Sequence, residues 1–279
     1  MTLKLSIIIP CYNSEKTLEK TLESVFTQIY DDWEALIIND GSTDGTEIIA
    51  LSWVEKDKRF KYFAKPNEGL GKTRNYGIAK SAGKYILPLD SDNLVVKDFA
   101  KIAIAILDSN SEIGVVHGHA EYFGNKTGLW KIDEFDMTKI LVDNYIDACA
   151  VYKKNLWNIV GGYDENMPFQ GNEDWDFWIA LGIENVRFYH LNQITFKYFV
   201  AKNSMIQSFT DKMHQLNNDY IYIKYNNEYQ KNYKKLYSMN IKREEEYSQI
   251  LKSKKFVIDL FCITFFKFSI FGTYKENKE

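Results

Sequence analysis

The chain has 279 residues, a length that suits one large domain or one domain with a helical appendage. Its 35 Lys and Arg residues against 38 Asp and Glu residues leave a net charge of −3, so no strongly basic field exists to attract nucleic acid. Hydrophobic residues make up 45% of the chain and charged residues 26%, which supports a sizeable buried core and excludes global disorder.

The cysteines and the apolar runs indicate a cytoplasmic protein. Cys11, Cys149 and Cys262 are odd in number and far apart, which favours a reducing compartment over a disulfide framework. The apolar run at residues 5–9 is too short for a signal peptide and ends at Pro10. The sequence has no run of about 20 apolar residues, so we expect no membrane-spanning helix.

Strands and helices are predicted to alternate along the first half of the chain. Continuous apolar runs predict strands over residues 5–9, 33–38, 61–64, 85–89 and 114–119. Helical spacing predicts a first helix that Asn13 or Ser14 caps, with an apolar stripe of Leu18, Leu22, Val25 and Phe26. Further helices are predicted over residues 43–54, 71–81 and 96–107. This alternation predicts an α/β fold with a mainly parallel sheet flanked by helices. Ligands of such sheets bind at the carboxyl ends of the strands.

Two acidic segments follow predicted strands. Residues 90–92 contain two carboxylates separated by one residue, which can hold a divalent cation that bridges nucleotide phosphates. In the segment 39–45, Asp40 can accept hydrogen bonds from a base or a ribose. Each segment alone is also typical of an ordinary turn or helix cap. Both together, at two strand ends of one alternating pattern, indicate a nucleotide site.

Six sequence blocks in order resemble the motifs of the family 2 glycosyltransferases, which have the GT-A fold. The blocks are SIIIPCYN (Ser6–Asn13), INDGSTD (Ile38–Asp44), NEGLGKTRNYG (Asn67–Gly77), LDSD (Leu89–Asp92), GGYDE (Gly161–Glu165) and EDWDFW (Glu173–Trp178). The match covers roughly residues 3–200. The resemblance implies a bacterial-type, inverting hexosyltransferase that moves a sugar from a nucleotide-sugar, expected to be a UDP-sugar, to a hydroxyl group.

The resemblance implies that the nucleotide lies at the strand ends. Pro10 and Tyr12 resemble the wall against which the base lies. Asp40 is similar to the aspartate that accepts the N–H of a uracil ring, and Arg74 to the arginine that reaches the nucleotide.

A metal site is implied at the LDSD block. Asp90 matches the residue that contacts the ribose, with Ser91 beside it, and Asp92 matches the ligand of Mn²⁺ or Mg²⁺, the cofactor that we expect. Many relatives also carry Tyr-Arg-x-His in a later segment, where the His helps at the metal and the diphosphate. Here the Arg and His positions hold Phe199 and Ala201, so we do not expect a further metal ligand from this segment.

Glu173 and Asp174 resemble the family's acidic pair near the acceptor. Asp174 is then the general base that removes the proton from the acceptor hydroxyl, and partial burial beside Glu173 raises its proton affinity. Asp176 is the residue most easily confused with Asp174. Without the resemblance, the pair is equally well interpreted as first-turn carboxylates that a helix dipole favours.

Several isolated residues leave two interpretations open. His117 and His119 are two apart on one strand face and form either a packing pair or a metal pair. His190 has no partner that the sequence identifies. Lys202 either offsets the charge of a diphosphate or is a solvated surface lysine.

Two other functions compete with sugar transfer. Residues 69–73 (GLGKT) imitate the end of a P-loop, but the first glycine of that loop would fall on Pro66, which has no amide to donate. A transferase-like scaffold that has lost activity and only binds partners or a membrane is the second alternative. Ala201 favours the scaffold, whereas the retained acidic residues argue for the enzyme.

The sequence predicts a GT-A catalytic domain over residues 1–205 and a helical C-terminal extension over 206–279. Within the domain, the nucleotide-sugar half covers about 1–123 and the acceptor half about 124–205. Residues 224–279 carry twelve Lys and Arg against seven Asp and Glu, a net charge of +5, which leaves −8 for the rest. This asymmetry indicates that the extension has a task of its own.

The apolar segment 256–271 is too short and too charged to span a bilayer. On a helix, Lys252, Lys255 and Asp259 would form one narrow polar face, which suits a helix in an anionic membrane interface. The alternative is packing onto the catalytic domain or onto a second subunit in a homo-oligomer. The expected partners are thus a nucleotide-sugar donor and a glycan or lipid-linked acceptor. A further partner is either the inner face of the plasma membrane, through residues 252–271, or a second copy.

Overall fold

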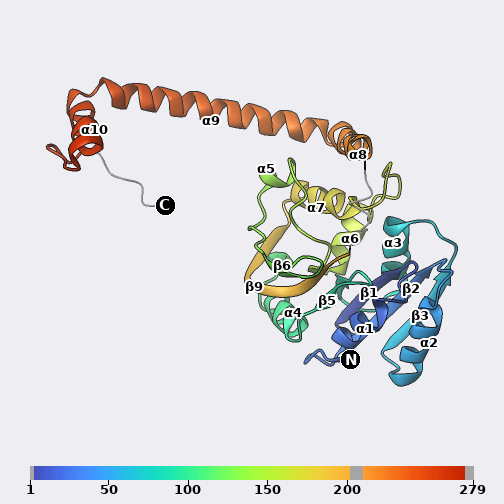
Figure 1. Cartoon of the computed structure of the whole chain (residues 1–279). Coiled ribbons are helices and arrows are strands. Elements are labelled where there is room, and N and C mark those ends of the chain that lie inside the picture. The colour runs from blue at the N-terminus through green and yellow to red at the C-terminus, as the bar shows by residue number, and fades with distance from the viewer. Residues whose placement is uncertain (1–2, 202–209, 274–279) are drawn as a thin grey trace. The chain divides into compact units, whose positions relative to one another are not determined.

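The computed structural model describes residues 3–201 and 210–273, so Lys202 lies outside the described residues. The chain forms two compact units, Met1–Lys224 and Tyr225–Glu279 (Figure 1). The first unit extends beyond residue 205, where the sequence predicts the end of the catalytic domain, because it includes the helix α8 (Asp211–Lys224).

The first four strands form the parallel half of a sheet. They are β1 (Leu5–Cys11), β2 (Trp33–Asp40), β3 (Phe60–Lys65) and β4 (Tyr85–Pro88). They lie in the order β3-β2-β1-β4, and each neighbouring pair is parallel. Every residue of β1 and β2 is buried, as expected of apolar strands that are covered on both faces. The four strands predicted in this part of the sequence are confirmed.

Beyond β4 the sheet is mixed. The remaining strands are β5 (Leu94–Val95), β6 (Ile113–Gly124), β7 (Gly128–Trp130), β8 (Val151–Lys153) and β9 (Arg187–Val200). Strand β8 pairs antiparallel with β4 and β6, β9 is parallel to β6, and β5 and β7 pair antiparallel with β9 and β6. The strand predicted at 114–119 is therefore part of the longer β6, which β8 separates from β4.

Helices flank the sheet (Figure 1). Those of the first unit, besides α8, are α1 (Leu18–Phe26), α2 (Thr46–Lys56), α3 (Leu70–Lys80), α4 (Phe99–Ser109), α5 (Met137–Ile140), α6 (Lys154–Val160) and α7 (Glu173–Ile183). Of the predicted apolar stripe of α1, Leu18, Leu22 and Val25 are buried, whereas Phe26 is half-buried.

The start of α1 differs from the prediction that Asn13 or Ser14 caps it, because the helix begins at Leu18. Asn13 has a left-handed φ of 51°, and its Oδ1 accepts a hydrogen bond from the Thr43 amide at 2.8 Å. The Ser14 amide donates to Thr46 Oγ1 at 2.7 Å. These groups join the turn after β1 to the turn after β2, so the two strand ends are held together.

Helix α3 lies close to the sheet because Gly77 has no side chain. A Cβ atom at this position would be 2.7 Å from Ile8 Cγ2 and 3.0 Å from Ile38 Cγ1, closer than carbon atoms pack. The close approach fixes α3 against β1 and β2. It also fixes Arg74, which lies about one turn earlier on the same helix.

The second unit consists of α9 (Asn226–Lys252) and α10 (Lys254–Phe266). No residue of α9 is buried. In the described part of the chain, no helix combines the length and the apolar character needed to cross a bilayer.

Candidate active site

The predicted nucleotide-binding residues meet at one edge of the sheet. Pro10 lies in β1 and Tyr12 follows that strand, Asp40 ends β2, and residues 90–92 follow β4. Strand β1 lies between β2 and β4 and is parallel to both, so the carboxyl ends of the three strands meet at the same edge of the sheet. Pro10 is buried, whereas the Tyr12 side chain is 54% exposed and offers a free aromatic surface.

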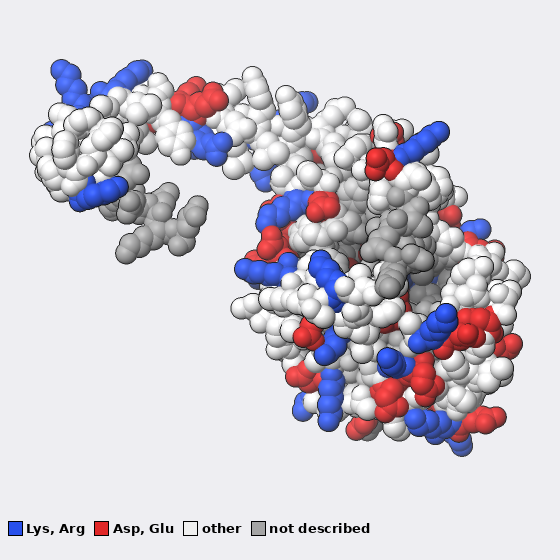
Figure 2. Space-filling model, in the orientation of Figure 1, with Lys and Arg blue, Asp and Glu red and all other residues white. Residues whose placement is uncertain are grey.

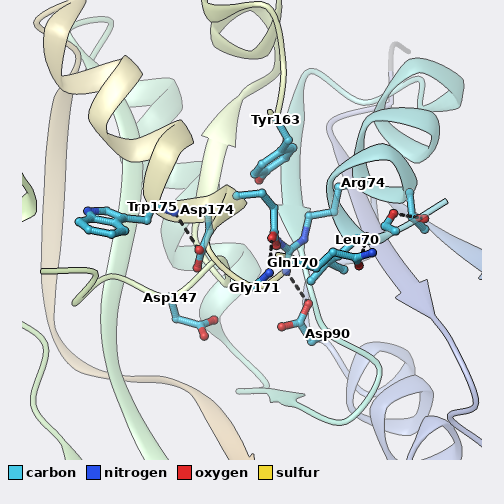
Figure 3. A network of polar contacts seen from close by, with 12 residues as sticks. Leu70, Arg74, Asp90, Asp147, Tyr163, Gln170, Gly171, Asp174 and Trp175 are labelled. Atoms are coloured by element: carbon cyan, nitrogen blue, oxygen red, sulfur yellow. Dashed lines mark hydrogen bonds and ion pairs between the residues drawn. The ribbon is translucent and has the colours of Figure 1, made fainter. Parts of the chain in front are cut away.

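Arg74 connects the two halves of the site (Figure 3). This side chain is only 2% exposed, and its Nη2 donates to Asp90 Oδ1 at 2.6 Å. Its Nη1 donates to Glu173 Oε1, at the start of α7. Asp90 follows β4 and Glu173 begins α7, so the guanidinium group ties the end of this strand to the start of this helix.

Asp174 is a buried carboxylate without a paired cation among the described residues. Its Oδ1 accepts hydrogen bonds from Asn144 Nδ2 at 3.1 Å and from the Trp175 amide at 2.8 Å. Burial and, to a smaller extent, the charge on Glu173 raise the pKa of Asp174 to about 7, against the opposing effect of Arg74. A carboxylate in this state can take up a proton near neutral pH.

Asp176 has a different environment, although it lies in the same helical turn. Its Oδ1 is 2.7 Å from Lys224 Nζ of α8, and the same ammonium group pairs with Asp164. Tyr220 of α8 also donates to Asp164, at 2.9 Å. The structure thus separates the two residues that the sequence leaves easy to confuse, because Asp176 braces α7 against α8.

The LDSD block places two carboxylates beside each other. Burial and, to a smaller extent, the charge on Asp90 raise the pKa of Asp92 to about 7. The Ser91 hydroxyl is 2.7 Å from the Ser14 hydroxyl and so ties the block to the turn after β1. Within residues 3–201 and 210–273, no group of three or more His, Cys, Asp and Glu side chains is arranged to hold a metal ion.

Asp40 binds its own chain. Its Oδ1 accepts hydrogen bonds from Lys65 Nζ at 2.5 Å and from the Glu68 amide at 3.0 Å, and its Oδ2 accepts one from the Gly69 amide at 2.9 Å. The next amide, that of Leu70, donates to the side chain of a residue in the acceptor half. Asp40 therefore fixes the loop that leads into α3. These amides are also the ones that would hold phosphate in a P-loop, so their internal partners argue against that alternative.

A shallow cleft lies between this loop and the segment before α7. It has a volume of about 190 Å³, and its lining includes Gly69, Lys72, Glu165, Gln170 and Glu173. Gln170 Oε1 is the group that accepts the Leu70 amide hydrogen bond, at 2.6 Å. The cleft thus adjoins the acidic pair at the start of α7.

Sequence reasoning missed two residues of the site, Asp147 and Tyr198. Burial raises the pKa of Asp147 well above its usual range, and the charges on Asp90 and Asp174 add to the effect. Asp90, Asp147 and Asp174 point toward a common space (Figure 3). Burial also raises the pKa of Tyr198, together with the charges on all these carboxylates. Asp147 lies in no recognisable motif, whereas Tyr198 stands at the first position of the Tyr-Arg-x-His segment and could have been found there.

The histidines pack together. The ring of His190 lies 5.1 Å from that of His117 and 4.8 Å from that of His119, between ring centroids, so His190 has partners that the sequence did not identify. Burial lowers the pKa of His117 to about 3, which keeps the ring neutral. Phe199, at the position of the missing Arg, donates its amide to Asn93 Oδ1 at 2.9 Å and so supports the segment beside β5.

Comparison with known sequences identifies relatives of the chain. The family model described as Glycosyl transferase family 2 matches residues 6–168. An uncharacterized glycosyltransferase of Rickettsia bellii (strain RML369-C) is 32% identical over 186 residues, which make up 66% of this chain and 27% of that relative. The chain therefore spans only a minor part of the length of this relative.

Two solved structures have a similar fold. S. aureus TarS 1-349 in complex with UDP-GlcNAc has a TM-score of 0.61 at 23% identity, over 76% of this chain and 64% of that chain. The mannosyltransferase PcManGT from Pyrobaculum calidifontis, in complex with GDP-Man and Mn²⁺, has a TM-score of 0.58 at 18% identity, over 72% and 58% of the two chains. These similarities confirm the α/β fold class of the GT-A type.

Proposed function

The chain belongs to glycosyl transferase family 2, and we propose that it is a bacterial-type, inverting glycosyltransferase. In this proposal it moves a sugar from a UDP-sugar to a hydroxyl group of a glycan, glycolipid or glycoprotein acceptor. The observation that carries the proposal is the bridge that Arg74 makes from Asp90 to Glu173, beside the buried Asp174 whose pKa is about 7. The UDP-GlcNAc in the similar TarS structure supports a uridine nucleotide.

The donor lies, in this proposal, against the ends of β1, β2 and β4. The exposed ring of Tyr12 stacks on the base, with Pro10 behind it, because an aromatic face provides apolar contact at small entropic cost. Asp40 holds the loop before α3 and uses the remaining lone pair of Oδ2 for the N–H of the uracil ring. Asp90 and Ser91 border the ribose.

Mn²⁺ or Mg²⁺ is the cofactor that we propose, and the residues at the LDSD block fit it. Asp90 and Asp92 offer hard oxygen donors. The pKa of Asp92 is raised because burial removes water from its negative charge, and a bound cation would compensate for that loss. When bound there, the cation would offset charge on the donor diphosphate. Asp92 is the residue that we expect to hold it.

The acceptor side of the reaction is assigned to Asp174, with Glu173 positioned beside it by Arg74. In the described part of the chain, both hydrogen bonds to the Asp174 carboxylate reach Oδ1, which leaves Oδ2 to take a proton. The acceptor oxygen bonds to the anomeric carbon as its proton passes to Asp174, and the bond from that carbon to the diphosphate oxygen breaks. A single displacement of this kind inverts the anomeric centre, so an α-linked donor gives a β-linked product.

A screen of nucleotide-sugars for hydrolysis and transfer tests the proposal, with titration calorimetry of the same compounds with and without Mn²⁺. We expect binding and turnover of a UDP-sugar, and an NMR coupling constant that shows a β-linked product. Binding without turnover toward any acceptor would favour the inactive scaffold. A retained α-linkage would exclude the single displacement.

A further inference from the structure

Exposed side chains of α10 and of the turn that follows it form an apolar surface, which we call the aromatic cap. It comprises Val257, Ile258, Phe261, Phe265, Phe266, Phe268, Ile270 and Phe271, and all of these side chains are exposed. Phe265 is the most exposed of them, at 67%. The aromatic rings are contiguous, with centroids 4.9 Å apart for Phe261 and Phe265 and 6.2 Å apart for Phe266 and Phe268.

Asp259 gives the cap its shape. The prediction that it lies on an exposed polar face of the helix is wrong, because its side chain faces inward. This residue is buried, and its Oδ1 accepts hydrogen bonds from the amides of Ile270 and Phe271, each at 2.7 Å. Its Oδ2 accepts two more from the amide and hydroxyl of Thr273. The carboxylate therefore folds residues 267–273 back along α10, because its lone pairs take the amides that the turn leaves unpaired.

The inward position of Asp259 leaves no acidic side chain exposed within the described residues 254–273. Asp259 is the only acidic residue between Glu246 and Lys275 in the sequence. Basic residues flank the cap in the sequence, namely Lys252, Lys254, Lys255 and Lys267, and Lys255 Nζ lies 5.7 Å from the centroid of the Phe271 ring. Figure 2 shows a white surface over α10 with blue side chains at its margin.

We propose that the aromatic cap inserts into the interface of an anionic lipid membrane, with the lysines on the headgroups. Apolar side chains flanked by lysines match both layers of such an interface, the acyl boundary and the anionic surface. A second copy of the chain fits this surface less well, because its lysines would face the same lysines without an acidic partner. The proposal is independent of the reaction that the first unit catalyses.

Co-sedimentation of the full chain with lipid vesicles tests this proposal. We expect binding to vesicles of phosphatidylcholine and phosphatidylglycerol, little binding to phosphatidylcholine alone, and weaker binding as salt rises. The variant Phe265→Ser/Phe266→Ser should lose binding more than tenfold. Replacing Lys252, Lys254 and Lys255 by Gln should weaken it on the order of a hundredfold, since each basic residue near the surface contributes about a factor of five.

The matched control is Tyr233→Ser/Tyr237→Ser, which removes two exposed, stacked rings from α9 outside the cap. It should bind vesicles like the unchanged protein, and circular dichroism should show that all variants retain their helices. The proposal is wrong if the full chain ignores anionic vesicles at low salt, or if the control and the Phe265 variant lose binding equally. It is also wrong if light scattering shows a dimer that the Phe265 variant dissociates while vesicle binding is unchanged.

Discussion

Asp40 and Asp174 are both buried carboxylates at the candidate active site, but their charges are balanced in different ways. Asp40, at the end of β2, is matched by the ammonium group of Lys65 and by two backbone amides. Among the described residues, Asp174 receives hydrogen bonds only from neutral groups, and its pKa is raised to about 7. The same contrast separates Asp90, which pairs with Arg74, from Asp92.

This contrast indicates which carboxylates hold the site together and which carry out its chemistry. A paired carboxylate stabilises the loops around it, whereas a buried carboxylate without a cation costs stability. Such unbalanced charges are typical of groups whose balance comes from a ligand or a transferred proton. We therefore assign Asp40 and Asp90 to holding the donor loops, and Asp92 and Asp174 to the metal ion and the acceptor proton.

The largest effect should come from Asp174→Asn, which removes the proposed base while keeping its shape. We expect turnover at saturating donor to fall roughly a hundredfold or more, since general-base catalysis contributes this much. Donor affinity should change little. Asp176→Asn is the matched control in the same helical turn, and it should lower turnover only a few-fold. Similar losses in the two variants would remove the distinction between them.

Asp92→Asn tests the second unbalanced carboxylate. We expect it to lower transfer at least tenfold, because the carboxylate that we propose to hold the cation is lost. EDTA should abolish transfer by the unchanged protein, and Mn²⁺ or Mg²⁺ should restore it. Full turnover in excess chelator would contradict the assignment.

Arg74→Met tests whether the carboxylates that pair with a cation stabilise the fold. The variant leaves Asp90 and Glu173 without their shared cation, and we expect the free energy of unfolding in urea to fall by about 3 kcal/mol. The control is Arg187→Met, which breaks an exposed pair with Glu112 and should cost less than about 1 kcal/mol. Equal losses in the free energy of unfolding would show that the buried ion pairs of Arg74 stabilise the protein no more than the exposed pair does.

The raised pKa values also predict a smaller, pH-dependent effect on stability. Asp92 and Asp174 bind protons more tightly in the folded chain than in the unfolded chain, so folding is favoured while they are protonated. Their contribution therefore declines as pH rises from about 4 to about 7, by at most about 1.4 kcal/mol per pH unit for each group. Urea unfolding of Asp92→Asn/Asp174→Asn should show a flatter pH dependence than the unchanged protein between pH 5 and pH 7. Parallel curves would contradict the raised values.

The sequence predicts those features of the site that depend on residues close together in the chain. The strands β1 and β2 could be predicted because each is a continuous apolar run. Asp92 and Asp174 were singled out by the resemblance of their blocks to family motifs, and their roles stay predictions. The internal partners of Asp40 could not, since Lys65 and Gly69 reach it only after β3 has paired with β2. Long-range packing likewise decides where Asp147 lies.

Long-range contacts also explain the two corrected predictions. Asn13 was expected to cap α1, but its side chain meets Thr43, thirty positions along the chain, because β1 and β2 end side by side. Asp259 was expected on an exposed helix face, yet the chain after α10 turns back and covers it. Helical periodicity describes one element and does not contain these contacts.

The central claim is that ligands balance the negative charge of the buried carboxylates that lack a cation among the described residues. Proton release on ligand binding tests this claim most directly. UDP-GlcNAc with Mn²⁺ can be titrated calorimetrically at pH 7 in buffers of different ionisation enthalpy. If the cation binds Asp92, whose pKa is about 7, roughly half a proton should be released for each complex formed, and Asp92→Asn should abolish that release. Binding without proton release, or equal release by Asp92→Asn, would contradict the account.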